Sequence, residues 1–326
     1  MSAAPIPFFG RSFKVQVTTA AAGTVTLADS SWGNESLRIT FETERLITME
    51  EAPYSTADIS IYNLDTATQN LVINQGDEVT LSAGYDYNKD TVIFQGKLFQ
   101  PLAERVDVID SKLTLRCIDW LLEDKSVHVE VTISAPSTQL DAVKLVAAQA
   151  GITSRDLDEV TLTQKKFPRG RTITGSAMKY FLEVASDNHL GISIWNGKLT
   201  MKSLTPNSDV PFQVFAPVHT DAPQTTGGLT KQTLIGTPQQ TERGVIFRVL
   251  LDSTVDLWQL VKLASPTVRR IPIAPNPTTI PVVNTDGLYA VISIRHSGDS
   301  RGNDWYTECG CVTREWEQLG LGTVPG

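Results

Sequence analysis

The stretch His296–Cys311, HSGDSRGNDWYTECGC, gathers a histidine, several acidic side chains and two cysteines within one short segment. Its central part, Gly298–Asp304, consists largely of residues that tolerate positive φ or cap their own backbone, so turn chemistry accounts for the acidic and amide side chains. A catalytic or metal site would need His296, Asp299 and Asp304 to converge on one point. His296, however, precedes the turn on a strand face, whereas both aspartates lie within the turn. We therefore predict a structural β-hairpin turn that holds no metal ion and no substrate.

The pattern that flanks this turn, in which apolar and polar side chains alternate, recurs in two regions of the chain. It dominates from Phe13 to about Trp120 and resumes near Val245, with examples in FKVQV, LRITF, VTLSAGY and ISIRH. Alternation with period two is typical of strands that bury one face. Many short strands separated by turn signals predict antiparallel β-barrels or sandwiches.

Between these two β regions the sequence pattern becomes helical. Apolar side chains at helical spacing predict helices over 139–150 and 176–188, and the segment GISIWNGKLTM follows as a hairpin. Asn196–Gly197 fits a two-residue type I′ turn, which would align Ile194 with Leu199. The sequence thus predicts a small α/β insert between two β domains.

The two β regions also resemble each other in the spacing of their last strands. Gly96 precedes Cys117 by 21 residues, and Gly287 precedes Cys309 by 22 residues. In both cases a strand follows the glycine, a polar turn comes next, and a returning strand leads to the cysteine. We therefore expect an internal structural repeat.

Together these patterns predict a mainly β fold with an α+β insert. The predicted domains are a first antiparallel β-barrel at 1–122, the insert at 123–225, a second β-barrel at 226–318 and a frayed tail at 319–326. The proline-rich segment 266–281 is predicted to be a long, partly extended loop whose role the sequence leaves open.

The charge balance argues against a surface that coats nucleic acid. The 326 residues carry a formal charge of −8, and the calculated isoelectric point is about 5.1. The basic run Lys165–Arg171 is predicted to be a solvated loop, with a partner-binding patch as the alternative. No apolar window approaches the roughly 18 residues of a membrane-spanning helix, and the amino terminus lacks the features of a signal peptide.

No group of residues has the spacing of a catalytic or metal site. The three cysteines make no disulfide framework, and Cys309 and Cys311, which would share one strand face, lack the further ligands that zinc needs. This cysteine usage indicates folding in a reducing cytoplasm. The histidines are scattered without ligand spacing: His128, His189, His219 and His296. The densest carboxylate group is expected to be a solvated face, with a glycosidase pair as the alternative: Glu42, Glu44, Glu50 and Glu51. We therefore predict no catalytic, cofactor-binding or metal-binding residue and no cofactor.

Three blocks of the sequence, taken together, resemble the baseplate hub proteins of tailed bacteriophages, a family also called late control or protein-D-like. The blocks are 57–85 (ADISIYNLDTATQNLVINQGDEVTLSAGY), 234–252 (LIGTPQQTERGVIFRVLLD) and 287–311 (GLYAVISIRHSGDSRGNDWYTECGC). They cover about a third of the chain and occur in the order that the family shows. None is a catalytic motif, so the specificity of the resemblance rests on the ordered set.

The resemblance implies two β-barrel domains similar to tail-tube subunits. In such hubs a homotrimer forms a ring of six barrels, which joins a six-fold tail tube to a three-fold spike around a channel for DNA. The internal repeat fits this geometry, because a duplicated domain lets a trimer imitate a hexamer. The implied partners are the tail tube or distal tail protein, the spike, other baseplate proteins and the tape measure protein, with DNA passing through without specific binding.

The resemblance also implies a location in the tail baseplate of the virion, after assembly in the host cytoplasm. We expect a channel lined by acidic and neutral polar side chains, with Lys and Arg turned toward protein neighbours and Lys165–Arg171 at the periphery, since phosphate contacts would retain the DNA. Two other classes remain open: a tail-associated cell-wall or polysaccharide hydrolase, and a carbohydrate-binding or receptor-binding β module with exposed aromatic residues such as Trp32 or Trp195.

Overall fold

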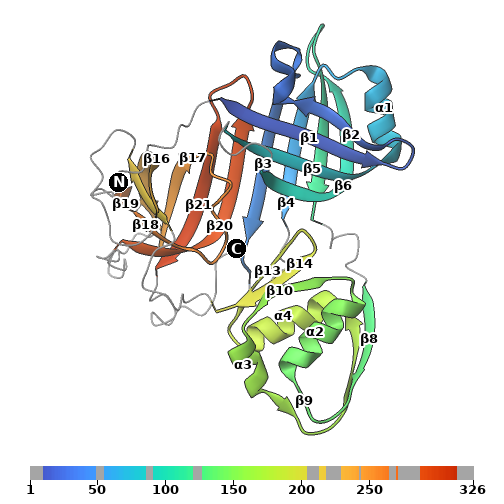
Figure 1. The fold of residues 1–326 in the computed structure, drawn as a ribbon, viewed down its shortest axis with the longest axis vertical. Coiled ribbons are helices and arrows are strands. Elements are labelled where there is room, and N and C mark those ends of the chain that lie inside the picture. The colour runs from blue at the N-terminus through green and yellow to red at the C-terminus, as the bar shows by residue number, and fades with distance from the viewer. Residues whose placement is uncertain are drawn as a thin grey trace, which may run out of the picture. The chain divides into compact units, whose positions relative to one another are not determined.

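The computed structural model divides the chain into two compact units (Figure 1). It describes residues 10–48, 55–85, 91–119, 127–203, 213–217, 229–241, 244–263, 269–270 and 287–313. The first unit draws on 1–44, 56–117 and 205–320 and holds both β regions, whereas the second is built around 45–55 and 118–204. Compared with the predicted domains, residues 45–48 thus group with the insert and residues 213–217 with the β regions.

The first β region folds as the alternating pattern predicts. Phe13, Val15 and Val17 are buried in its core, and Lys14 and Gln16 on the same strand are only partly covered. Its elements are β1 (Arg11–Thr19), β2 (Gly23–Asp29), the 3-10 helix η1 (Ser30–Glu35), β3 (Ile39–Leu46), β4 (Thr56–Tyr62), α1 (Thr66–Gln75), β5 (Gly76–Tyr85), β6 (Val92–Arg105) and β7 (Ser111–Ile118).

Helix α1 was not predicted from the sequence. It begins at a local cap, because the Asp65 carboxylate accepts a hydrogen bond from the Thr68 N–H at 2.9 Å. Only Val72 of this helix is buried, so it carries no apolar stripe that periodicity could reveal.

The second β region forms a closed circuit of strand pairing. Its strands are β15 (Gln213–Pro217), β16 (Leu229–Gln240), β17 (Gly244–Leu250), β18 (Leu260–Leu263), β19 (Arg269–Arg270), β20 (Leu288–Asp299) and β21 (Trp305–Thr313). The order β18-β15-β16-β17-β21-β20 returns to its start because β18 also pairs with β20. The predicted loop 266–281 lies outside the described residues except for β19, which pairs with β16.

The two β regions share the order of neighbouring strands, as the predicted repeat requires. In the first, β4-β7-β6-β5-β1-β2 follow one another, and in the second the corresponding order is β17-β21-β20-β18-β15-β16. One strand departs from the repeat: β1 pairs antiparallel with its neighbours, whereas β15 runs parallel to both β16 and β18.

The described residues do not show two complete barrels, which corrects the sequence-based expectation in part. The single strand β16 pairs with both β15 and β17, so the second circuit closes. The equivalent segment of the first region is broken into β2 and β3 by η1, and β3 pairs with β20 rather than with β2. The result, among the described residues, is one large, mainly antiparallel sheet of fourteen strands that curls through both regions (Figure 1).

The second unit has the α/β character that its sequence predicts. Three helices, a three-stranded sheet and a two-stranded sheet contribute to a separate core that includes Val143, Phe181 and Ile192. Its elements are β8 (His128–Ile133), β9 (Ser137–Thr138), α2 (Gln139–Gln149), β10 (Thr153–Leu157), α3 (Glu159–Gln164), β11 (Lys166–Phe167), β12 (Arg171–Ser176), α4 (Ala177–Asp187), β13 (Gly191–Trp195) and β14 (Lys198–Lys202).

Local signals specify this unit well. Both predicted helices are present, and α2 starts with a reciprocal cap between Thr138 and Asp141. The predicted turn is confirmed, because Asn196 and Gly197 both have positive φ and Ile194 pairs with Leu199. Among the described residues, no helix is both long enough and apolar enough to traverse a bilayer.

Candidate functional site: a docked hairpin and a polar sheet face

The stretch His296–Cys311 forms a hairpin whose tip is held by the first β region. Residues 300–304 make the turn between β20 and β21. Arg11 on β1 donates hydrogen bonds from Nη1 to the carbonyls of Asp299, at 2.8 Å, and Gly302, at 2.6 Å. Ser300 and Ile39 exchange further bonds, since the Ser300 N–H donates to the Ile39 carbonyl and the Ile39 N–H donates to Ser300 Oγ, both at 2.9 Å. The tip is therefore a docking element within the first unit.

Trp305 anchors this hairpin in the core of the first β region. Its side chain is 2% exposed, and its indole Nε1 donates to the carbonyl of Gly84 at 3.1 Å. The ring meets Phe41 edge-on with 5.3 Å between centroids, and the Arg11 guanidinium lies 5.4 Å from the indole centroid. Gly298 must stay small here, because a Cβ would lie 2.4 Å from the Phe41 ring.

The three residues that could have formed a metal site have separate partners. His296 is buried, and its Nδ1 lies 2.8 Å from Thr307 Oγ1. The Asp304 carboxylate accepts a hydrogen bond from the Tyr306 hydroxyl at 2.6 Å. Asp299 binds Arg38 at 2.6 Å instead. Within the described ranges no group of three or more His, Cys, Asp or Glu side chains could hold a metal ion.

The environment of Asp299 favours its charged form. Burial opposes ionisation, but hydrogen bonds from Arg38 and from the Arg301 N–H outweigh it, so the pKa of Asp299 lies below its ordinary value. A carboxylate that stays charged at low pH suits an ion pair better than it suits a general acid.

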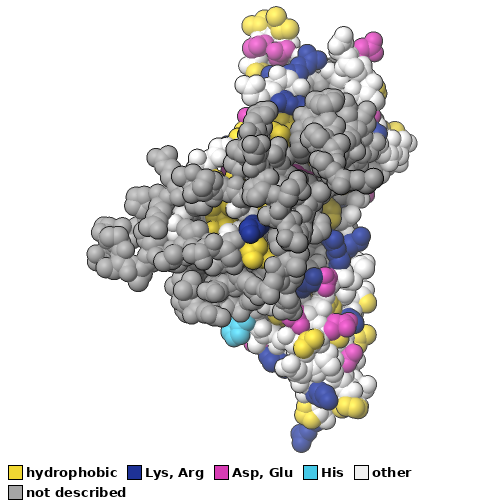
Figure 2. Space-filling view, turned by 60° about the vertical axis from the view of Figure 1, so that its left-hand side comes forward, with side chains coloured by type: hydrophobic (Ala, Val, Ile, Leu, Met, Phe, Trp, Pro, Cys, Tyr) yellow, Lys and Arg dark blue, Asp and Glu magenta, His cyan; other side chains and the backbone are white. Residues whose placement is uncertain are grey.

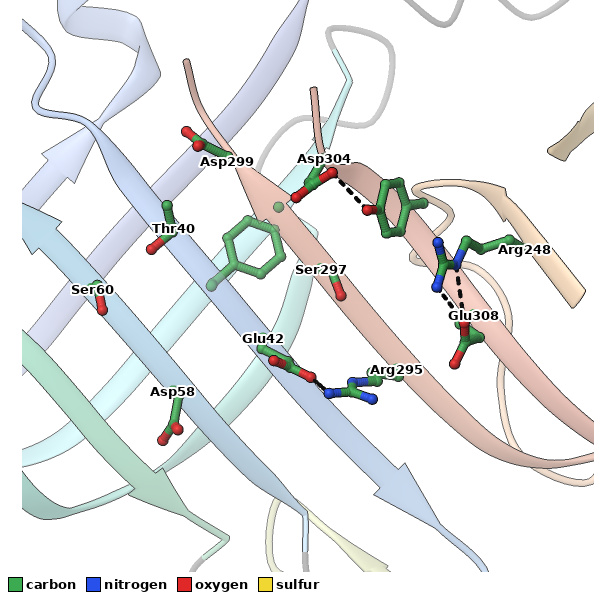
Figure 3. Close-up of a pocket in the computed structure, with 13 residues that line it drawn as sticks. Thr40, Glu42, Asp58, Ser60, Arg248, Arg295, Ser297, Asp299, Asp304 and Glu308 are labelled. Atoms are coloured by element: carbon green, nitrogen blue, oxygen red, sulfur yellow. Dashed lines mark hydrogen bonds and ion pairs between the residues drawn. The ribbon is translucent and has the colours of Figure 1, made fainter. Parts of the chain in front are cut away.

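A hollow of about 450 Å³ opens on the polar face of the sheet, where strands of the two β regions meet (Figure 3). It lies over β17, β21, β20, β3 and β4, on the face away from the buried apolar side chains of these strands. Its lining residues are Thr40, Phe41, Glu42, Asp58, Ser60, Arg248, Arg295, Ser297, Gly298, Asp299, Asp304, Tyr306 and Glu308.

Charges of opposite sign alternate across this hollow. The Arg248 guanidinium binds the Glu308 carboxylate with its Nη2 2.9 Å from Oε2, and Arg295 on β20 forms an ion pair with Glu42 on β3 (Figure 3). The register explains most of the row, because Arg248 and Arg295 each lie opposite Glu308. Cross-strand pairs of opposite charge stabilise a sheet, whereas Glu42 lies opposite another carboxylate, Asp58.

The predicted carboxylate group is only partly represented in this row. Glu42, one member of the predicted carboxylate group, is engaged by Arg295, and Glu44 is exposed. The other two members, Glu50 and Glu51, lie outside the described residues. The row itself was not predicted, because the pairing of β3 with β20 brings together residues about 250 positions apart, which no local pattern signals.

The cysteines are structural rather than reactive. Cys117, Cys309 and Cys311 are free thiols, and all three are buried. Burial raises the pKa of each thiol well above its ordinary value, so the neutral form dominates at neutral pH. Cys309 and Cys311 share the inward face of β21, as their spacing predicts.

The two aromatic residues considered for ligand binding lie in different surroundings. Trp195 stacks against two cations, with the guanidinium carbons of Arg45 and Arg155 at 4.0 and 5.9 Å from its ring centroid. Trp32 is 44% exposed on η1, where it is the single large exposed aromatic side chain among the described residues of that helix.

The remaining candidates lie apart from one another. His128 starts β8 and is exposed, His189 has a positive φ of 54° after α4, and His219 lies outside the described residues. The basic run Lys165–Arg171 is largely exposed, with Lys165 Nζ donating to the Asp187 carbonyl at 3.0 Å. Figure 2 shows Lys and Arg interspersed with Asp and Glu on the face that it presents.

Comparisons with known proteins identify the fold. No protein-family model matches the chain, and no curated protein sequence matches it. The 43 kDa tail protein of prophage MuSo2 from Shewanella oneidensis is 10% identical with a TM-score of 0.53, over 97% of this chain and 99% of that one. The tail protein from Neisseria meningitidis MC58 is 13% identical with a TM-score of 0.51, over 94% and 98%.

A third similar structure is a chain of the lidless PdpA–VgrG complex. It is 9% identical with a TM-score of 0.51, and the match covers 94% of this chain and 65% of that one. At such low identity these matches concern the fold alone. The chain therefore shares, over nearly its whole length, the fold of these two tail proteins.

Proposed function

We propose that this protein is a structural tail protein of bacteriophage type, and that three copies form the baseplate hub ring. The observation that carries the proposal is the repeated strand order, which gives one chain two similar β regions joined in a single sheet. Three such chains can present six similar surfaces to a six-fold tube while keeping three-fold symmetry toward a spike. The shared fold with two tail proteins supports the same role.

In this proposal the ring surrounds a channel for DNA, and the polar face of the sheet lines it. The opposite face of the same strands is packed into the cores, so the polar face is the one available to water. Arg248 and Arg295 lie on this face, and each is paired with a carboxylate. Paired arginines leave little net positive charge to hold phosphates.

The partners in this proposal are the tail tube or distal tail protein on one side and the spike on the other, with other baseplate proteins and the tape measure protein nearby. The protein would act in the virion tail after assembly in the host cytoplasm. The proposed role requires no catalysis, and four carboxylates of the hollow are each bound by another side chain, which supports a non-enzymatic function: Glu42, Asp299, Asp304 and Glu308.

Light scattering coupled to size-exclusion chromatography on the purified chain tests the ring. We expect a mass three times the 35.7 kDa of one chain, and ring-shaped particles with a central hole in electron micrographs. A monomer that persists at high concentration would contradict the hub ring. Release of sugars or peptides from bacterial cell walls by the purified protein would favour the hydrolase alternative instead.

A further inference from the structure

The tip of the β6–β7 hairpin, residues 106–110 (VDVID), exposes apolar and acidic side chains together. Val108 and Ile109 are 86% and 87% exposed, and Val106 is 53% exposed. Figure 1 shows this hairpin projecting from the first β region at the top of the view, and Figure 2 shows hydrophobic side chains beside acidic ones at that end. Three apolar side chains exposed on one short loop are unfavourable in water unless a partner covers them.

The turn at this tip is fixed by hydrogen bonds that do not involve its apolar side chains. The Asp107 carboxylate accepts from the N–H groups of Ile109, at 2.7 Å, and Asp110, at 2.8 Å. The Val106 N–H donates to the Asp110 carbonyl at 2.9 Å, and Asn63 Nδ2 donates to the Asp110 carboxylate at 2.8 Å. The turn therefore holds its shape and leaves the apolar side chains available to a partner.

The tip carries net negative charge. At its base, Lys112 pairs with Glu104 at 3.0 Å, and Arg105 Nη2 donates to the Val108 carbonyl at 3.3 Å. Among the described residues no cation forms an ion pair with Asp107 or Asp110. Backbone N–H groups that donate to Asp107 hold its pKa below the ordinary value, so its carboxylate stays charged at neutral pH. The tip thus fits a surface that is both basic and partly apolar.

The run Lys165–Arg171 (KKFPRGR) in the second unit has this character. Residues 160–178 contain no acidic residue and four basic ones: Lys165, Lys166, Arg169 and Arg171. The facing strands supply no compensating charge, because Lys166 pairs with Thr138 and Arg171 with Ile133, and residues 131–140 carry no charged side chain. The positive charge of this run is therefore not balanced by its neighbours in the ribbon.

The side chains of the run are accessible. Lys166, Pro168 and Arg169 are exposed, and the Arg171 guanidinium lies 5.6 Å from the centroid of the Phe167 ring. In the part of the chain that the structure describes, none of the four cations takes part in an ion pair. The run therefore offers cations beside Phe167 and Pro168, which matches the carboxylates and apolar side chains of the tip.

We propose that the tip of the β6–β7 hairpin of one copy, residues 106–110, docks on the run Lys165–Arg171 of a second copy. Each copy carries one of each surface, so the contact is heterologous and can close a ring of three. Docking would bring Asp107 and Asp110 to the cations of the run and shield Val108 and Ile109 from water. The proposal rests on the proposed ring and names the surfaces that close it.

A first experiment reverses two charges of the run, with Lys166→Glu and Arg169→Glu in one chain. Both side chains are exposed in the single chain, so its melting temperature should change little, whereas the dissociation constant of the trimer should rise at least tenfold. The matched control is Lys179→Glu with Lys198→Glu, which changes the net charge equally at two other exposed positions of the second unit and should leave the trimer intact.

An exchange of charges tests whether the two surfaces touch directly. Asp110→Lys, added to the double reversal of the run, should restore part of the lost trimer affinity, because it again places opposite charges across the contact. The same Asp110→Lys substitution in the otherwise unchanged chain should weaken the trimer.

Cross-linking maps the contact without relying on these charge variants. Chains carrying Val108→Cys are co-expressed with chains carrying Arg169→Cys and treated with a short bismaleimide. The native cysteines are buried, so covalent dimers should form with this pair and not when Lys198→Cys replaces Arg169→Cys.

The outcomes separate this docking from the ring itself. A wild-type trimer that gives no cross-link and survives the double reversal would refute the docking and leave the ring proposal standing. Binding of labelled duplex DNA that the double reversal abolishes, with the trimer unchanged, would assign the run to nucleic acid and also refute the docking. A wild-type monomer would overturn both the docking and the ring.

Discussion

Trp305 completes a core whose other members come mostly from residues 13–117. Its indole is fixed by one hydrogen bond to Gly84 and by edge contact with Phe41, so its position depends on both β regions at once. Around it, Arg11 and Arg38 bind the hairpin tip through carbonyl and carboxylate oxygens. Single side chains thus attach the end of the second β region to the first.

Replacing Trp305 should destabilise the fold. Trp305→Ala removes a side chain that is 2% exposed, and we expect it to lower the free energy of unfolding by about 3–5 kcal/mol in urea denaturation. Trp32→Ala, at a 44% exposed position, is the control and should change stability by less than about 0.5 kcal/mol. Equal losses in the two variants would show that Trp305 does not anchor the hairpin.

Asp299 should make stability depend on pH. Because its pKa is depressed in the folded protein, the charged carboxylate stabilises the fold above the unfolded pKa near about 4, and this contribution is lost as pH falls through the folded value. Asp299→Asn should therefore lower the free energy of unfolding by roughly 0.2–1 kcal/mol at pH 7. The loss is modest because Arg38 is partly exposed, and the difference from the wild type should become smaller in acid. Unfolding free energies measured at pH 7 and in acid, with Glu44→Gln as the control, show whether the difference between variant and wild type shrinks as pH falls.

At the scale of elements, the helices and turns that were predicted correctly are those that neighbouring residues specify. The helices α2 and α4 and the turn at Asn196–Gly197 follow from capping, apolar spacing and positive φ. Helix α1 was missed because its buried surface is small, and α3 because it is short. The β20–β3 pairing, on which the charged row depends, could not be predicted because strand neighbours far apart in sequence leave no periodic signal.

The cap of α2 gives an element-scale prediction. Thr138 Oγ1 accepts a hydrogen bond from the Asp141 N–H at 3.2 Å, and the Asp141 carboxylate accepts one from the Thr138 N–H at 2.8 Å. Thr138→Ala should lower the stability of the second unit by about 1 kcal/mol, whereas Thr138→Ser should retain most of it. The helical circular dichroism signal, followed during thermal unfolding, distinguishes the Ala variant from the Ser variant. Identical unfolding curves for the two variants would rule out a role for the cap.

At the scale of the whole molecule, duplication and electrostatics act together in the proposed ring. The repeated strand order supplies similar surfaces, and the cross-strand ion pairs neutralise the arginines of the polar face. The balance between Arg and Glu on that face, rather than the net charge of the chain, would then decide whether passing DNA is retained.

Two substitutions would remove the carboxylates that pair with the arginines of the polar face. The double substitution Glu42→Gln and Glu308→Gln frees Arg295 and Arg248 without changing side-chain size, so we expect weak binding to duplex DNA that falls steeply with salt. The control Glu159→Gln frees Lys144 in the second unit and should not produce such binding inside a ring. Fluorescence anisotropy with labelled DNA at two salt concentrations measures the effect, and no gain in affinity would argue against the neutralised face.

The insertion of Trp305 into the first β region also sets an order of events during synthesis. About 190 residues separate Ile118, where β7 and the first β region end, from Trp305, so a ribosome that adds about 5–20 residues each second needs on the order of ten to forty seconds to bridge them. Throughout that interval the nascent first region lacks Trp305 and the strand β20 that pairs with β3. A ring could then close only from chains whose translation has passed this hairpin, which would keep partly made copies out of the assembly.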